Sequence, residues 1–95
     1  MMSTIPFKLE NLNKDELENE ILRIGIIAEL DAINLYEQLA SLTKDEKLKE
    51  VLLDIAKEEK THVGEFLSLL LIKDKEGEKE LKNGEKEVKE ILEKK

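Results

Sequence analysis

The chain has 95 residues, of which 41% are charged and 40% are hydrophobic, and its formal net charge is −7. This length suits one small domain over residues 1–95, and the excess of acid disfavours nucleic acid as a partner, because phosphates need a basic patch. The absence of cysteine excludes disulfides and thiolate metal sites. No stretch reads as a signal peptide or a membrane span, so we expect a cytoplasmic protein without a membrane partner.

The pattern predicts an all-α fold that opens with a lead-in over residues 1–12 and a first helix over 14–42. Asn13, with Glu16 three residues later, is typical of a helix N-cap with its reciprocal acid. The middle of this helix is more apolar than one buried stripe requires. The main stripe holds Leu22, Ile26, Ile33 and Tyr36, and other apolar residues fall outside it, namely Ile21, Ile24 and Leu35. A lone helical hairpin cannot cover both faces, so we expect self-association.

A second start signal, Thr43 with Glu46, predicts another long helix over 44–72. Because the connection between the two helices is short, they are expected to form an antiparallel two-helix hairpin.

Residues 73–77 are charged and end in glycine, which predicts a solvated break after the hairpin. A shorter C-terminal helix is expected over 78–93, with a kink or break at Asn83-Gly84. Its narrow apolar stripe consists of Leu81, Val88, Ile91 and Leu92.

The only histidine of the chain, His62, lies three residues after Glu59, so both side chains share one face of the second helix. Their neighbours on that face are apolar: Leu48, Leu52, Ile55, Phe66 and Leu69 or Leu70. A carboxylate and an imidazole in an apolar stripe are unfavourable unless a partner satisfies them. A bound metal ion would do so.

The first helix carries one carboxylate within its own apolar stripe, that of Glu29. Glu29 lies 15 residues before Lys44, where the hairpin turns, and Glu59 lies 15 residues after it. In an antiparallel hairpin both therefore stand ~22 Å from the turn, at a rise of 1.5 Å per residue. We expect the two carboxylates and His62 to face one another.

One hairpin would thus supply one Glu and one Glu-x-x-His, which is half of the ligand set of a di-iron carboxylate bundle. Two chains related by a two-fold axis would complete the set with four carboxylates and two imidazoles. Such oxygen and nitrogen ligands suit iron or manganese, with zinc as a mimic.

Two segments, residues 28–38 (AELDAINLYEQ) and 58–62 (EEKTH), resemble the encapsulated ferritins, two-helix members of the ferritin-like superfamily that occur with encapsulin shells. The resemblance implies that dimerisation completes a ferritin-like four-helix bundle. It implies a ferroxidase that oxidises Fe(II) to Fe(III), with oxygen or peroxide as acceptor, at a di-iron site between two subunits. The expected metal ligands are Glu29, Glu59 and His62, and Tyr36 is expected to act beside the irons.

The same resemblance implies an annular decamer of five dimers and an encapsulin shell protein as partner, with iron mineralisation inside that compartment. Iron is the expected metal, with manganese, zinc or calcium as substitutes. Some members carry an outer metal site whose positions correspond here to Ala28 and Asp31, and Ala28 has no ligand atom. The C-terminus, residues 90–95, does not resemble a linker ending in a shell-targeting peptide.

Two rival interpretations stay open: a rubrerythrin-like di-iron peroxidase, which would need an electron donor, and a metal-free helical oligomerisation module. Glu65, three residues beyond His62, could extend the ligand set, but a solvated position is favoured. Gly25 and Gly64 either permit a close approach of helices or are simply tolerated.

Overall fold

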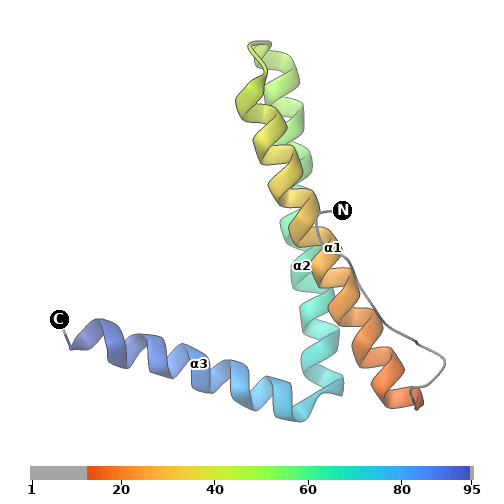
Figure 1. Cartoon of the computed structure of the whole chain (residues 1–95), viewed down its shortest axis with the longest axis vertical. Coiled ribbons are helices and arrows are strands. Elements are labelled where there is room, and N and C mark those ends of the chain that lie inside the picture. The colour runs from red at the N-terminus through yellow and green to blue at the C-terminus, as the bar shows by residue number, and fades with distance from the viewer. Residues whose placement is uncertain (1–12, 95) are drawn as a thin grey trace.

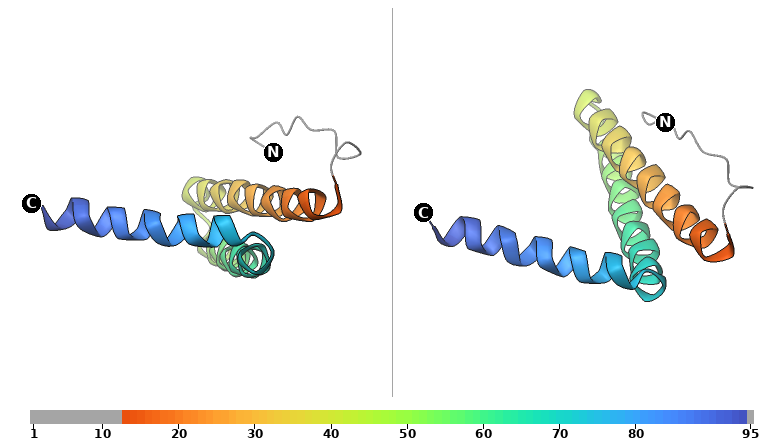
Figure 2. Two further views of the ribbon diagram at one scale, coloured as in Figure 1. Left: turned by 90° about the horizontal axis from the view of Figure 1, so that it is seen from below. Right: turned by 60° about the horizontal axis from the view of Figure 1, so that its bottom comes forward.

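The structure, a computed structural model, describes residues 13–94 and is all-α over that range. It contains α1 (Lys14–Leu42), α2 (Glu46–Lys73) and α3 (Lys75–Glu93). α1 and α2 lie side by side as an antiparallel hairpin, and α3 turns away from the end of α2, so that the chain has the outline of an L (Figure 1). Two further views show that α3 does not fold back along the hairpin (Figure 2). The expected lead-in over residues 1–12 lies outside the described residues.

The first helix is capped as its sequence indicates. The Asn13 side chain accepts a hydrogen bond from the backbone N–H of Glu16 at 2.8 Å, which satisfies one of the free donors at the N-terminus of α1. At the other end, the N–H of Thr43 donates to the carbonyl of Leu39, and α1 stops at Leu42.

The expected start of the second helix at residue 44 was wrong, because Asp45 and not Thr43 is its N-cap. Oδ1 of Asp45 accepts hydrogen bonds from the N–H groups of Lys47 and Leu48, at 3.0 and 3.3 Å. The Thr43 hydroxyl is occupied by the N–H of Asp45, at 3.1 Å, and so it orders the loop. A carboxylate at this position also interacts favourably with the helix dipole, and α2 therefore begins at Glu46.

The expected break over residues 73–77 was also wrong, because it is reduced to Asp74 alone. The N–H of Asp74 donates to the carbonyl of Leu70, which closes α2, and its carboxylate accepts from the N–H of Gly77 at 2.9 Å, which opens α3. A Cβ atom at Gly77 would lie 2.5 Å from Oδ2 of Asp74, so the glycine makes room for the cap. α3 consequently begins at Lys75, three residues earlier than expected.

No kink occurs at Asn83-Gly84, contrary to expectation, and α3 continues to Glu93. The Asn83 side chain donates to the Glu80 carboxylate one turn earlier, and no residue in the described range has a positive φ. One glycine in a solvated helix costs only about 1 kcal/mol relative to alanine, which the surrounding Glu and Lys residues tolerate.

Hydrophobic packing within one chain is limited to a narrow seam between α1 and α2. The buried apolar residues in the described range are Leu22, Ile33, Ala40, Ala56 and Leu70. Ile21 and Leu35, which lie outside the main stripe, are each 49% exposed. The stripe of α3 is more than half exposed at Leu81, Val88, Ile91 and Leu92. Much apolar surface therefore remains for contacts with other molecules.

The register of the hairpin is visible in three cross-helix contacts. Lys73 donates to Glu18 at 2.7 Å, the ring of Phe66 lies against Gly25, and His62 contacts Glu29 at 2.9 Å. From one contact to the next, the number of residues passed along α1 equals the number passed in the opposite direction along α2. This register brings the centres of the two helices together at the polar residues predicted from the sequence.

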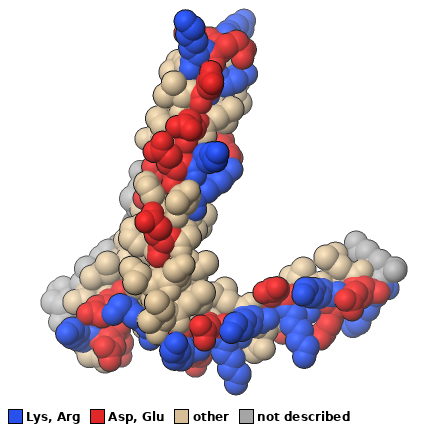
Figure 3. All heavy atoms as spheres, turned by 180° about the vertical axis from the view of Figure 1, so that it is seen from behind, with Lys and Arg blue, Asp and Glu red and all other residues tan. Residues whose placement is uncertain are grey.

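The surface carries acidic and basic side chains that are interspersed with one another (Figure 3). Seen from behind, basic and acidic side chains alternate along α3, and uncharged surface is continuous where α3 leaves the hairpin (Figure 3). Over the residues that the structure describes, no helix combines the length and the hydrophobicity needed to cross a bilayer.

Candidate metal centre

Three side chains from two helices converge near the middle of the hairpin. Glu29 projects from α1, and Glu59 and His62 project from α2, one helical turn apart. Nδ1 of His62 lies 2.9 Å from Oε2 of Glu29 and 3.4 Å from Oε2 of Glu59. One potential ligand atom from each residue lies within 4.8 Å of the other two. In the described residues this is the one group of three or more Asp, Glu, His or Cys side chains so arranged.

The cluster lies at the surface of the single chain rather than inside it. The side chains of Glu29 and Glu59 are 20% and 19% exposed, and that of His62 is 46% exposed. The carboxylates are thus largely shielded by the hairpin, whereas the imidazole faces outward. A second molecule could cover this face without unfolding the hairpin.

The three groups perturb one another electrostatically. A hydrogen bond to Glu29 raises the pKa of His62, burial opposes that shift, and the nearby Glu59 adds to it. The pKa of Glu59 is also raised, chiefly by its hydrogen bond to the Glu29 carboxyl, then by burial and by the like charge of Glu29, while His62 opposes the shift. Two carboxylates and one imidazole at this separation favour a positive charge among them, which a proton or a metal cation can supply.

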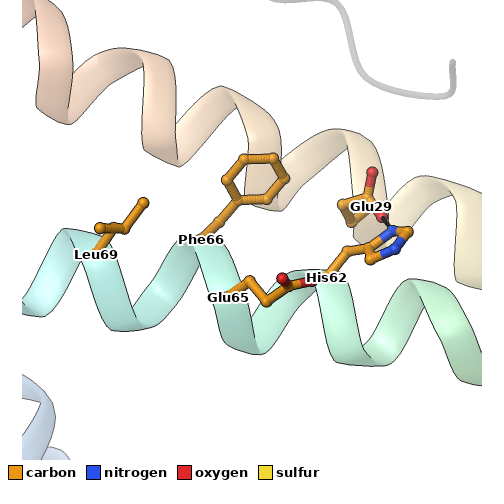
Figure 4. A pocket seen from close by; sticks show the side chains of 5 residues that line it. All are labelled: Glu29, His62, Glu65, Phe66 and Leu69. Atoms are coloured by element: carbon orange, nitrogen blue, oxygen red, sulfur yellow. Dashed lines mark hydrogen bonds and ion pairs between the residues drawn. The ribbon is translucent and has the colours of Figure 1, made fainter.

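A cavity of about 410 Å³ adjoins the cluster along α2 (Figure 4). Glu29 and His62 form its polar end, Phe66 and Leu69 form its apolar wall, and Glu65 lines it as well. Glu65 is exposed, as expected, and does not belong to the group of three. Its position beside the cavity was not predicted from the sequence.

The remaining site residue expected from the resemblance, Tyr36, stands outside the group of three potential ligands. It is half-buried on α1, seven residues beyond Glu29 towards the hairpin loop. At 1.5 Å per residue this places its backbone about 10 Å along the helix axis from that of Glu29. The role of Tyr36 beside the cluster stays a prediction.

Two contacts between α1 and α2 were missed by sequence reasoning. One is the contact between Phe66 and Gly25, although the possibility of a close helix approach at Gly25 was recognised. The other is the ion pair between Lys73 and Glu18 at the open end of the hairpin. Both depend on the register of the hairpin, which a helical pattern alone does not specify.

The donor set matches metals that prefer oxygen and nitrogen ligands. Two carboxylates and one imidazole are typical of iron and manganese sites, and zinc also accepts them. Three ligands from one chain leave coordination positions unfilled. These positions could be taken by residues of a second chain or by exogenous ligands.

Comparison with known proteins gives consistent results. A family model described as EncFtn-like matches residues 5–85. A ferritin-like-encapsulin shell fusion protein of Pyrococcus furiosus is 62% identical over 78 residues, which are 82% of this chain and 22% of that protein. The chain therefore spans about a fifth of the length of this curated relative. The crystal structure of the encapsulated ferritin domain from Pyrococcus furiosus is 53% identical to the chain, with a TM-score of 0.75, covering 95% of this chain and 86% of that one.

Proposed function

The chain belongs to the EncFtn-like family, and from that premise we propose that it is a ferroxidase, which oxidises Fe(II) to Fe(III) at a di-iron site formed between two subunits. The observation that carries the proposal is the convergence of Glu29, Glu59 and His62, with ligand atoms within 4.8 Å of one another. Each of these residue types is a normal ligand of iron. Glu29 on α1 lies close to Glu59 and His62 on α2 because of the register of the hairpin.

The need for two subunits follows from what one chain contains. The sequence holds a single histidine, and one hairpin contributes only two helices. Di-iron carboxylate bundles use four helices, with a Glu from each of two and a Glu-x-x-His from each of the others. A two-fold axis beside the outward face of His62 would double the set and complete a four-helix bundle. The exposed apolar residues Ile21 and Leu35 supply further surface for assembly, for which we propose an annular decamer.

The residues act by holding and neutralising the substrate. Glu29 and Glu59 balance the charge of the ferrous ions, and His62 presents Nδ1 to them when that atom carries no proton. Oxidation removes one electron from each Fe(II), and dioxygen or peroxide accepts the electrons. The resulting Fe(III) is stabilised by the same carboxylates, since hard anionic oxygen ligands favour the higher charge. Tyr36 is proposed to act beside the irons in the assembled dimer.

We further propose that the ferric product is mineralised inside an encapsulin-type compartment. The support comes from the relative described as a ferritin-like-encapsulin shell fusion protein, which combines the two parts in one chain. An annular decamer has no sealed interior, so localisation within such a compartment would keep the ferric product from escaping.

The proposal is tested by measuring the metal content of the purified protein and its rate of Fe(II) oxidation by stopped-flow absorbance, with oxygen and with peroxide in separate reactions. A ferroxidase binds iron and oxidises it with no further electron donor. Peroxide turnover that requires an added donor would favour the rubrerythrin-like peroxidase instead. Protein that binds no iron, and oxidises none above the buffer rate, would leave the metal-free oligomerisation module as the better interpretation.

A further inference from the structure

One helical turn below the candidate metal centre, α1 and α2 touch through a glycine and an aromatic ring. Gly25 lies four residues before Glu29 on α1, and Phe66 lies four residues after His62 on α2. Because the helices are antiparallel, the Gly25–Phe66 pair lies about one helical turn from the Glu29–His62 pair on the same side of the hairpin seam. The ring of Phe66 points from α2 towards α1 beside the ligand residues (Figure 4).

The ring occupies the space that a side chain at position 25 would need. A Cβ atom built on Gly25 would lie 3.1 to 3.2 Å from three carbons of the Phe66 ring, tighter than ordinary contacts between such atoms. Accommodating it would require a shift of a few tenths of an ångström. The absence of a side chain at Gly25 therefore allows the two helices to pack as closely as they do.

We infer that Phe66, seated on Gly25, is a positioning residue of the metal centre, which holds Glu29 within reach of Glu59 and His62. The inference rests on the proposed function, because it concerns the same site. Glu29 is the one member of the cluster that α1 supplies, so any change in the separation of α1 and α2 alters its distance to the other two. Phe66 itself is not a ligand and acts through the helices that carry the ligands.

The magnitudes support a functional effect. Metal–ligand distances in a well-formed site are held within about 0.2 Å. The shift that a methyl group at position 25 would force is of the same size or larger. If the ring moved instead of the helix, it would displace the wall of the cavity of about 410 Å³ that it lines together with Glu29 and His62. Either response disturbs the ligand side of the hairpin.

Helix propensity makes the opposite prediction, which allows the two effects to be separated. Alanine is a better helix former than glycine, so replacing Gly25 by alanine favours the isolated helix. Gly64 offers a matched control on α2, two residues from His62, because a Cβ atom there meets nothing within 4 Å. The same substitution at the two glycines thus has the same effect on propensity and different consequences for the site.

The test uses the 95-residue chain as wild type, Gly25→Ala, Gly64→Ala and the double variant Gly25→Ala/Phe66→Leu. Co(II) is titrated as the probe and followed by its visible absorption spectrum, and helicity is followed by circular dichroism. We expect Gly64→Ala to match the wild type. We expect Gly25→Ala to bind Co(II) about 10-fold more weakly, as is usual when a residue supporting a ligand is disturbed, with an altered spectrum but undiminished helicity. The smaller leucine in the double variant is expected to restore most of the affinity.

A wild-type affinity and spectrum in Gly25→Ala would overturn the inference and leave the proposed function standing. A loss of affinity that accompanies loss of helicity, or that the double variant does not restore, would assign Gly25 to folding and also overturn the inference. If the wild type and Gly64→Ala both fail to bind Co(II) and to oxidise Fe(II), the proposed function itself is wrong.

Discussion

Nδ1 of His62 lies 2.9 Å from Oε2 of Glu29, although 33 residues separate the two in the chain. This contact joins the middle of α2 to the middle of α1, and Glu59 approaches the same nitrogen at 3.4 Å. Many of the large apolar side chains along the hairpin are exposed. A polar cluster at the centre of such a surface contributes little to the stability of one chain, because its groups lack enough partners there. The same cluster is well suited to bind a cation between two chains.

The first prediction concerns the three proposed ligands. Glu29→Ala, Glu59→Ala and His62→Ala are each expected to lower the initial rate of Fe(II) oxidation by more than about 100-fold, since losing a ligand exceeds the effect of losing a supporting residue. Glu58→Ala is the matched control, because Glu58 is a neighbouring exposed acid outside the cluster. The measurement is stopped-flow absorbance at equal protein concentration. A fast initial rate in His62→Ala would show that the site has been assigned to the wrong residues.

The second prediction is that metal drives assembly. One chain holds half of the proposed ligand set, so metal binds the dimer more tightly than the monomer and shifts the equilibrium by mass action. Native mass spectrometry with and without Fe(II), under anaerobic conditions, is expected to show more dimer and higher oligomer when metal is present. The Glu59→Ala variant is expected to lose this response. If the oligomer distribution of the wild type is the same with and without Fe(II), that result would argue against a shared site.

The third prediction concerns pH. The pKa of His62 is raised, first of all by its hydrogen bond to Glu29, and the pKa of Glu59 is raised chiefly by its hydrogen bond to the Glu29 carboxyl. Both groups therefore retain protons to higher pH than free side chains do, and these protons must leave before metal binds. Metal affinity is expected to increase with pH through and above the usual histidine range, about 6 to 8, with release of protons.

Calorimetry at one pH, in two buffers of different ionisation enthalpy, measures that release directly. His62→Gln serves as the control, because it removes the imidazole proton and is expected to reduce the number of protons released. Equal apparent enthalpies in the two buffers would mean that no proton is displaced, contrary to this account.

The fourth prediction concerns the elbow between α2 and α3. Asp74 caps α3 through the N–H of Gly77, and a Cβ atom at position 77 would lie 2.5 Å from Oδ2 of Asp74. Gly77→Ala is therefore expected to weaken the cap, at a cost of about 1 kcal/mol, and to increase hydrogen exchange in the first turn of α3. Gly84→Ala, in open space on the same helix, is expected to increase helicity instead. Identical behaviour of the two variants would show that the cap does not hold the elbow.

The elements that sequence patterns predicted well are those with local causes. The apolar period and the Asn13 cap indicate α1, and the embedded polar residues indicate that Glu29, Glu59 and His62 share a face, which the structure bears out in their positions. Their role as metal ligands stays a prediction. The resemblance to the encapsulated ferritins is confirmed by the comparisons.

The elements that were mispredicted depend on competition between neighbouring groups. Thr43 and Asp45 both have capping side chains, and which one caps α2 is decided by the geometry of the loop. Asp74 ends one helix and begins the next, so a stretch with the composition of a loop shrinks to one residue. The contact of Phe66 with Gly25 depends on the register of α1 against α2, which no local sequence pattern specifies.

The central claim is that iron binds between two copies of this chain at Glu29, Glu59 and His62. The most direct test is an anomalous-scattering map, recorded at the iron absorption edge from crystals grown with Fe(II). The account predicts two peaks beside a two-fold axis, at bonding distance from Glu29, Glu59 and His62 and from the same residues of a second copy. The absence of peaks at these side chains, or a peak bound wholly within one chain elsewhere, would contradict it.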